Sequence, residues 1–212
     1  LVEGSGVTSW LGHGASVEEM EHTVGKPLPY CEVAILDTKT GEKLPPGQQG
    51  EICTQEVIPG CHFMKGYYKK PKETAEMIRD GYLHSGDLGM MREDGNLQIT
   101  GRLKDMYLVG GFNVYPAEVE DFLLKHPKVK QVSVVGVPDR RLGEVGAAFV
   151  ALKEGQKATE EEIIEFCKDK IANVKVPRYV MFIDEFPMNP QGKIQKFKLR
   201  DMAIRHWGLQ EP

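Results

Sequence analysis

Three short segments of the sequence carry side chains that could bind or act on a phosphorylated ligand. In the first, Asp87 lies in a glycine-flanked turn, where a carboxylate can accept two hydrogen bonds from a ribose diol. In the second, Arg102 offers a rigid fork of N–H donors to a hydroxyl or a phosphate. In the third, Lys193 follows proline and glycine on a turn that would leave its ammonium free to stabilise a phosphoryl-type transition state. The segments are residues 81–87, 101–105 and 189–193.

Each of these signals also has an ordinary explanation. Asp87 could satisfy the backbone of its own turn, and Arg102 could belong to a charged surface turn. Gly110 and Gly111 would let a backbone pass close to a ligand, but glycine loops are common. A single lysine such as Lys193 is most often solvated at the surface. None of the segments identifies a function by itself.

The elements that must position these residues change character along the chain. Residues 1–22 are rich in glycine and serine and contain no clear nucleating element, as if the chain had been taken from a longer protein. Apolar residues then alternate with polar ones in residues 31–35, which indicates a strand. The other elements predicted before residue 102 are strands at 51–55 and 95–101 and a short helix at 72–79.

After residue 104 the pattern becomes one of mixed helices and strands. Pro116 suits the first turn of a helix that ends at Lys125, and Thr159 with Glu162 forms a capping box for another. The remaining predicted elements are strands at 129–137, 147–152 and 179–183 and a final helix at 198–207. The sequence thus predicts an α/β (α+β) fold, with a β-rich subdomain over residues 1–102 and a small α/β domain over 103–212.

Composition narrows the classes of function. With 41% hydrophobic and 27% charged residues, the chain has the make-up of a soluble globular protein. No apolar run approaches the ~20 residues of a membrane span, and no signal peptide opens the chain, so a cytoplasmic location is expected. A net charge of −4 argues against nucleic-acid binding. Basic residues still gather near the C-terminal end, where a small anion could bind: Lys193, Lys196, Lys198 and Arg200.

The four cysteines have neither a CxxC pair nor the spacing of metal ligands. They are Cys31, Cys53, Cys61 and Cys167. Free thiols in a reducing compartment explain them better than disulfides or zinc. We therefore expect no metal site formed by the residues of this chain.

The order and spacing of the motifs are more specific than any one of them. From about residue 23 onward the sequence resembles the adenylate-forming superfamily of acyl-CoA synthetases, peptide-synthetase adenylation domains and beetle luciferases. The matches are residues 50–53 and 64–68 with the GEL/I…GY segment, 84–87 with TGD, 101–105 with the GRxKD hinge, 111–120 with GxNxxPxExE and 190–193 with PxGK. His84 and Ser85 stand where the family usually has a threonine, which leaves Asp87 in register.

The resemblance implies roles for the candidate residues in nucleotide chemistry. Asp87 and Arg102 would bind the ribose of ATP, with Ile99 packed nearby. Lys193, also an ATP-binding residue, would be the catalytic lysine that reaches the α-phosphate and the carboxylate oxygen during adenylation.

Other residues would serve the second half of the reaction. Lys104 would be the hinge between a large N-terminal domain and the mobile small C-terminal one. Gly110 and Gly111 would line the passage used by the thiol arm of coenzyme A.

The implied reaction joins a carboxylic acid to a thiol. ATP, with Mg²⁺, would convert the acid to acyl-AMP, and coenzyme A would then accept the acyl group. The sequence is most similar to fatty or medium-chain acyl-CoA synthetases. The family's phosphate loop, its YGxTE segment and its acid pocket lie upstream, so we expect this chain to be a C-terminal portion that is inactive alone. Two alternatives stay open: an adenylation domain that loads a carrier protein, and a non-catalytic interaction module. A homodimer is also left open.

Overall fold

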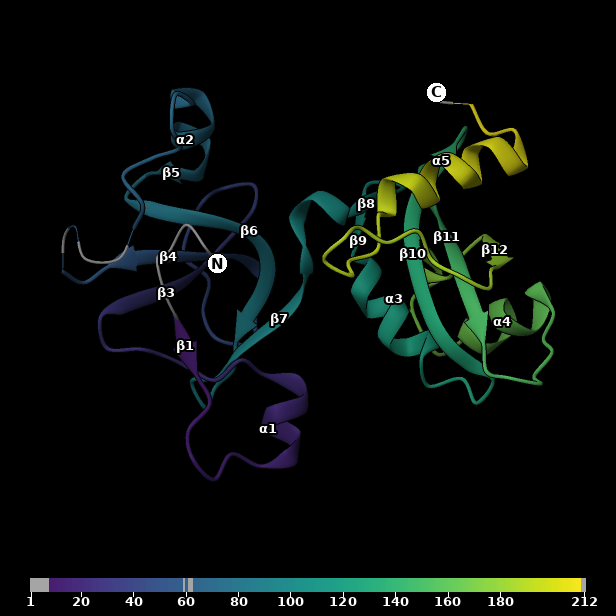
Figure 1. The fold of residues 1–212 in the computed structure, drawn as a ribbon, viewed down its shortest axis with the longest axis horizontal. Helices are drawn as coiled ribbons and strands as arrows, with labels where there is room; N and C mark the ends of the chain where they lie inside the picture. Colours follow the sequence, from purple (N-terminus) through teal and green to yellow (C-terminus); the bar gives the residue numbers. More distant parts are fainter. Residues whose placement is uncertain (1–7, 59, 61–62, 211–212) are drawn as a thin grey trace. The chain divides into compact units, whose positions relative to one another are not determined.

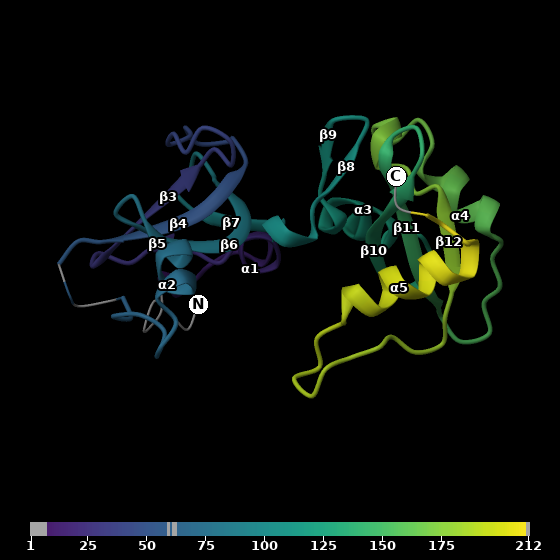
Figure 2. The ribbon, with the colours of Figure 1, turned by 90° about the horizontal axis from the view of Figure 1, so that it is seen from above.

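The computed structural model describes residues 8–58, 60 and 63–210 and divides the chain into two compact units (Figures 1 and 2). The first unit is Leu1–Leu103 and the second is Lys104–Pro212. Each unit combines a sheet with helices, which confirms the predicted α/β (α+β) fold class. The division falls one residue after the boundary expected from the change in sequence pattern.

The first unit is built on a five-stranded antiparallel sheet in which β6 contacts three other strands. The order is β3-β4-β6-β5, with β7 also paired to β6. The strands are β3 (Cys31–Leu36), β4 (Gly50–Glu56), β5 (Ile78–Arg79), β6 (Tyr82–Met91) and β7 (Leu97–Arg102). A helix α2 (Pro71–Met77) precedes β5, and a small sheet joins β1 (Ser9–Trp10) to β2 (Lys26–Pro27). Apolar side chains of β3, β4 and β7 form its main core cluster: Cys31, Val33, Ile35, Ile52 and Leu97.

The helix α1 (Val17–His22) corrects the expectation that residues 1–22 contain no nucleating element. Ser16 Oγ accepts the backbone N–H of Glu19 at 3.2 Å, and the Glu19 carboxylate accepts the backbone N–H of Ser16 at 2.8 Å. This reciprocal capping box satisfies donors that an isolated helix end leaves exposed. The serine with glutamate three residues later was visible in the sequence and could have predicted this helix.

The second unit contains a five-stranded mixed sheet, ordered β10-β11-β8-β9, with β12 parallel to β11. The strands are β8 (Tyr107–Val109), β9 (Phe112–Val114), β10 (Val129–Asp139), β11 (Gly143–Leu152) and β12 (Tyr179–Phe182). The helices are α3 (Pro116–Leu123), α4 (Glu160–Cys167) and α5 (Lys196–Trp207). Short 3₁₀ turns lie at η1 (Leu103–Asp105), which spans the boundary between the units, and at η2 (Asn173–Lys175).

Two layers of helices cover opposite faces of this second sheet (Figure 2). On one face, Val134 of β10 and Val150 of β11 pack with Val119 of α3 and Ile163 of α4. The neighbouring residues of the same strands point the other way and pack with Leu199 of α5. Because side chains alternate along a strand, two strands buried on both faces read as continuous apolar runs. This is why residues 129–137 and 147–152 were recognisable as strands.

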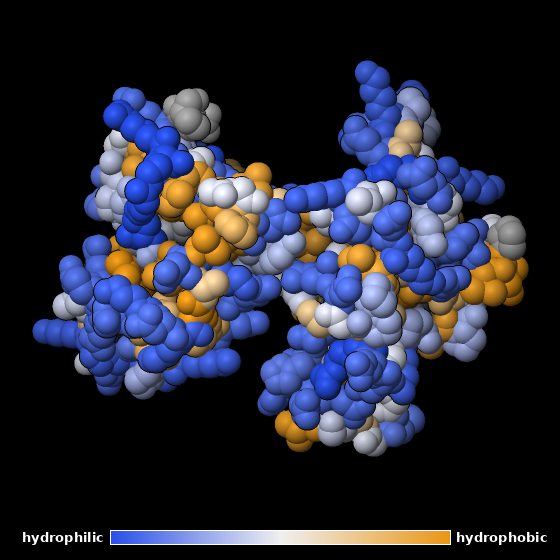
Figure 3. Space-filling view, turned by 180° about the vertical axis from the view of Figure 1, so that it is seen from behind, coloured by the Kyte–Doolittle hydropathy of each residue, from blue (hydrophilic) through white to orange (hydrophobic). Residues whose placement is uncertain are grey.

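The predicted helices of the second unit form, with small shifts of their ends. Thr159 Oγ1 accepts the backbone N–H of Glu162 at 3.2 Å, and the helix that begins there ends at Cys167. Helix α5 starts at Lys196, two residues earlier than predicted. Figure 3 shows a face that is largely hydrophilic with smaller apolar groups. Within the part of the chain that the structure describes, we find no helix with the length and apolar character of a membrane span.

Candidate active site

Asp87 lies in a strand and not in the turn predicted from its flanking glycines. In the pairing of β4 with β6, Glu51 is opposite Leu88 and Cys53 is opposite His84. The three residues at 85–87 therefore lie opposite Ile52 alone. Such an excess of residues on one strand is a β-bulge, which bends the strand and redirects its side chains. Gly86, with φ of 70°, takes the left-handed conformation that the bulge requires.

Side chains complete the hydrogen bonds that the sheet cannot make at this bulge. The Ser85 hydroxyl donates to the Ile52 carbonyl at 2.6 Å and accepts the Asp87 N–H at 3.0 Å. A carboxylate oxygen of Glu51 accepts the Gly86 N–H at 3.1 Å. The Glu51 carboxylate thus fixes the backbone at Gly86, and the Ser85 hydroxyl fixes it at Asp87.

Asp87 and Arg102 lie side by side on β6 and β7. They are paired in the sheet register, and Arg102 Nε is 3.3 Å from Asp87 Oδ1. Both side chains are partly exposed, so an acceptor and a donor are presented together to solvent. Ile99 lies earlier on β7 and is 49% exposed, an accessible apolar neighbour on the same strand.

An open cavity of about 460 Å³ is lined by residues that are next to this pair in the chain. Its walls include Gly86, which precedes Asp87, and Leu103, which follows Arg102. The side chains of Lys70 and Arg79 also line it. The cavity therefore places acidic and basic side chains next to Gly86, within the segment 81–87 identified from the sequence.

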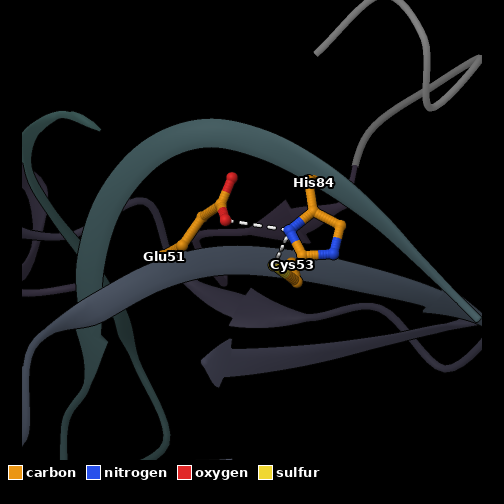
Figure 4. Close-up of side chains that lie close together, drawn as sticks. All are labelled: Glu51, Cys53 and His84. Carbon is orange, nitrogen blue, oxygen red and sulfur yellow. Dashed lines mark hydrogen bonds and ion pairs between the residues drawn. The ribbon is translucent and has the colours of Figure 1, made fainter. Parts of the chain in front are cut away.

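Sequence reasoning missed a buried cluster beneath the bulge, formed by Glu51 and Cys53 of β4 and His84 of β6 (Figure 4). His84 Nδ1 lies 2.8 Å from Glu51 Oε2 and 3.3 Å from Cys53 Sγ. Arg79 adds an ion pair to the same glutamate oxygen at 3.7 Å. The available signal in the sequence was weak, because residues 54–56 of β4 are also polar and a glutamate there does not stand out. Once buried, however, such a charged residue needs a partner.

The three residue types of this cluster can ligate metals, but their surroundings favour a hydrogen-bonded cluster over a metal site. Burial raises the pKa of the Cys53 thiol to about 12, so the thiolate that a metal would bind is disfavoured. Both carboxylate oxygens of Glu51 already have donors, from Gly86 and His84. A thiol and an imidazole are also not the oxygen ligands that Mg²⁺ prefers.

Lys193 lies in the second unit, at the exposed end of a loop. The predicted turn is present: an isolated bridge joins Met188 to Ile194, and Gly192 has φ of 73°. The side chain of Asn189 closes the loop, because its Oδ1 accepts the N–H groups of Gln191 at 3.1 Å and Lys193 at 2.8 Å. The backbone N–H of Asn189 donates in return to the Lys193 carbonyl at 2.9 Å.

Acidic partners engage two of the four basic residues expected to attract an anion. Lys196 Nζ is 2.7 Å from Glu120, whose carboxylate also accepts the Val134 N–H at 2.7 Å. Arg200 is 2.8 Å from Glu144. Lys196 thus joins α5 to α3, and Arg200 joins α5 to β11, so both cations already have acidic partners. An anion site at the C-terminal end stays a prediction.

Gly110 and Gly111 form the turn between β8 and β9. Their φ angles are 57° and 87°, and two consecutive positive φ angles are typical of a tight hairpin turn. This conformation is a structural reason for both glycines. Leu108 and Phe112, on either side, are exposed apolar residues. Lys104 is exposed within η1 and begins the second unit.

Comparison with known proteins places the chain in a family. Residues 1–68 match the family model of the AMP-binding enzymes, and residues 118–193 match that of the AMP-binding enzyme C-terminal domain. The chain is 50% identical over 204 residues to a putative acyl-CoA synthetase, YngI, of Bacillus subtilis (strain 168), covering 96% of this chain and 36% of that protein. It is 46% identical over 195 residues to the mitochondrial medium-chain acyl-CoA ligase ACSF2 of Bos taurus, covering 92% and 31%.

Solved structures agree with this result. ATP-bound MatB from Rhodopseudomonas palustris has a TM-score of 0.79 at 36% identity, over 86% of this chain and 36% of that one. The o-succinylbenzoate CoA synthetase MenE of Bacillus subtilis, in complex with the acyl-adenylate intermediate OSB-AMP, has a TM-score of 0.81 at 31% identity, over 95% and 40%. The chain belongs to the AMP-binding, adenylate-forming enzymes, which confirms the resemblance in the motifs. It spans about a third of the length of the curated relatives named above.

Proposed function

We propose that this chain is part of an acyl-CoA synthetase that activates a carboxylic acid, a fatty acid of medium length, with ATP and transfers it to coenzyme A. The observation that carries the proposal is the Asp87–Arg102 pair, a partly exposed carboxylate and guanidinium whose chain neighbours Gly86 and Leu103 line an open cavity. Membership of the AMP-binding enzymes supports a nucleotide as the proposed ligand of that pair. The name of the bovine relative supports a medium-chain acid and coenzyme A, rather than a carrier protein, as acceptor.

In the first half-reaction, an oxygen of the substrate carboxylate attacks the α-phosphorus of ATP and pyrophosphate leaves. Asp87 would accept hydrogen bonds from the ribose hydroxyls, and Arg102 would donate to them. Lys193 would place its ammonium against the charge that develops between the α-phosphate and the attacking carboxylate. Mg²⁺ would accompany ATP and neutralise phosphate oxygens.

In the second half-reaction, the thiolate sulfur of coenzyme A attacks the acyl carbon of the adenylate and AMP leaves. The proposed hinge at Lys104 would exchange Lys193 for the turn at Gly110 and Gly111, which would line the path of the thiol arm. The exposed Leu108 and Phe112 beside that turn could contact the apolar part of the arm. The first unit would belong to the large AMP-binding domain and the second would be the mobile C-terminal domain.

The test uses the longer protein and follows each half-reaction. Exchange of pyrophosphate into ATP should depend on added acid and should be strongest with medium-chain fatty acids. Acyl-CoA should form when coenzyme A is added. An enzyme that adenylates the acid but transfers it only to a carrier protein would contradict the proposed acceptor, and a lack of acid-dependent exchange would contradict the function.

Two expectations accompany this proposal. The 212-residue chain by itself should show no acid-dependent pyrophosphate exchange, because positioning and preorganised charge lower such barriers and upstream groups supply part of both. A cytoplasmic location stays a prediction, since the bovine relative is named as mitochondrial.

A further inference from the structure

The carboxylate of Glu51 is the centre of the buried cluster under the bulge. Glu51 is 5% exposed, and its two oxygens face the His84 ring on one side and the Gly86 N–H on the other. A buried carboxylate is tolerated only when such donors replace water. Its position is therefore set by the strand pairing of β4 with β6, and Gly86 is tied to it.

Gly86 has open space on the side where a side chain would lie. A Cβ built on this residue would meet no atom within 4 Å. On the β4 side, the bulge interrupts the regular pairing at residues 85–87. There the segment is held by the bond from the Gly86 N–H to Glu51 and by the bonds of the Ser85 hydroxyl to Ile52 and to the Asp87 N–H, while on its other side Asp87 is paired with Arg102 of β7.

We propose that Glu51 and Ser85 are positioning residues for Asp87, and that they set how well the site recognises the ribose hydroxyls of the nucleotide. Glu51 acts through Gly86, while Ser85 holds the Asp87 N–H directly. The inference rests on the proposed contact between Asp87 and the ribose. It adds that the position of the Asp87 carboxylate depends on two further side chains of the same sheet. Small displacements of a binding group cost much of its effect, so loosening either tie weakens ribose recognition.

His84 contacts Glu51 directly, whereas Cys53 is paired with His84 at the edge of the bulge. His84 Nδ1 lies 2.8 Å from Glu51 Oε2, and its buried Nε2 has no partner among the described residues. The Cys53 thiol shares the contact with Nδ1, at 3.3 Å, and its hydrogen-bond contact is with His84 rather than with residues 85–87. It is therefore a matched control: a substitution there disturbs the same buried space without loosening the bulge.

The experiment measures discrimination between AMP and 2′-deoxy-AMP by titration calorimetry on the longer protein. A hydrogen bond to a charged group is worth roughly 10- to 100-fold in affinity, and the unaltered enzyme should prefer AMP by about that factor. Glu51→Met fills the volume without an acceptor and should reduce the preference to about threefold or less. Glu51→Gln keeps an oxygen for the Gly86 N–H and should retain most of it. Cys53→Ala should leave the preference unchanged.

The ratio of the affinities for AMP and 2′-deoxy-AMP distinguishes a positioning role from general destabilisation of the protein. A merely destabilised protein would bind both nucleotides more weakly by the same factor, and that outcome in Glu51→Met would overturn the inference. If Glu51→Met does not yield folded protein, Ser85→Ala loosens the other tie through a half-buried hydroxyl and should also reduce the preference. An unchanged ratio in Ser85→Ala would overturn the inference in that case.

Two further measurements keep the result unambiguous. Asp87→Ala should abolish the preference; if it does not, the proposed ribose contact is wrong, and the failure belongs to the proposed function. Metal analysis of the purified protein should find no stoichiometric zinc. One equivalent of zinc that is lost in His84→Ala would make the cluster a metal centre and overturn its role as a positioning network.

Discussion

The two segments that carry the candidate site residues are held in contrasting ways. Asp87 lies inside a sheet, next to a bulge tied to buried groups, and pairs with Arg102 on the adjacent strand. Lys193 lies on an exposed loop that is closed by the side chain of Asn189 together with local backbone bonds. The contrast is consistent with the proposed mechanism. There Asp87 binds the nucleotide in both half-reactions, whereas Lys193 acts only in the first. The predictions below test that difference.

The largest effect is expected for Lys193→Ala in the longer protein. Adenylation should slow by roughly two to three orders of magnitude, the usual result of removing one preorganised transition-state donor. Thioester formation from supplied acyl-adenylate should change far less, because it involves no attack at the α-phosphate. Acetylation of Lys193 should mimic the substitution by removing the charge. Equal losses in both half-reactions would demote Lys193 to a structural residue.

The next largest effect is expected for Lys104→Pro. Proline fixes φ near −65° and restricts the residue before it, so a rotation about this position would be blocked. Domain closures concentrate their backbone changes in a few such residues. If the fixed angle suits adenylation, acyl-AMP should still form while most thioester formation is lost. Single-turnover measurement of both products decides this, with Lys104→Ala as the milder control. Normal thioester formation in the proline variant would place the pivot elsewhere.

A smaller effect is expected for Asn189→Ala. The change removes the acceptor for two N–H groups of the loop and should lower the adenylation rate about tenfold, in line with one lost hydrogen bond. Asn189→Asp keeps an acceptor oxygen and should restore much of the rate. Thioester formation from acyl-adenylate serves as the internal reference. A loss of the same size in that step would indicate that the loop only supports the fold.

Glu120→Ala should change the reaction rates least, but it should clearly lower the free energy of unfolding. It leaves Lys196 unpaired and the Val134 N–H without its acceptor. Stability should fall by about 2 kcal/mol, the usual cost of an unsatisfied buried group. Denaturant unfolding of the 212-residue chain would measure this. Glu165→Ala, which breaks only an exposed pair with Lys168, should change stability by under ~0.5 kcal/mol. Equal effects would mean that Glu120 does not anchor α5.

The sequence by itself determined the local elements and the family. Helix starts at Pro116 and at Thr159 follow from local capping chemistry, and both helices form there. The strands at 129–137 and 147–152 follow from their apolar runs. Such signals act over a few residues and so can be read directly. The order of the five motifs identified the adenylate-forming enzymes without any coordinates.

Only the tertiary structure decided what surrounds the candidate residues. The tie between Glu51 and Gly86 spans 35 residues, and the pair of Lys196 with Glu120 spans 76. No local pattern reports which residues strand register or helix packing brings together. For that reason a glycine-flanked turn was predicted where a bulged strand exists, and the acidic partners of Lys196 and Arg200 were not predicted. The pairing of β4 with β6 turned an unremarked glutamate into the centre of the cluster beside Asp87.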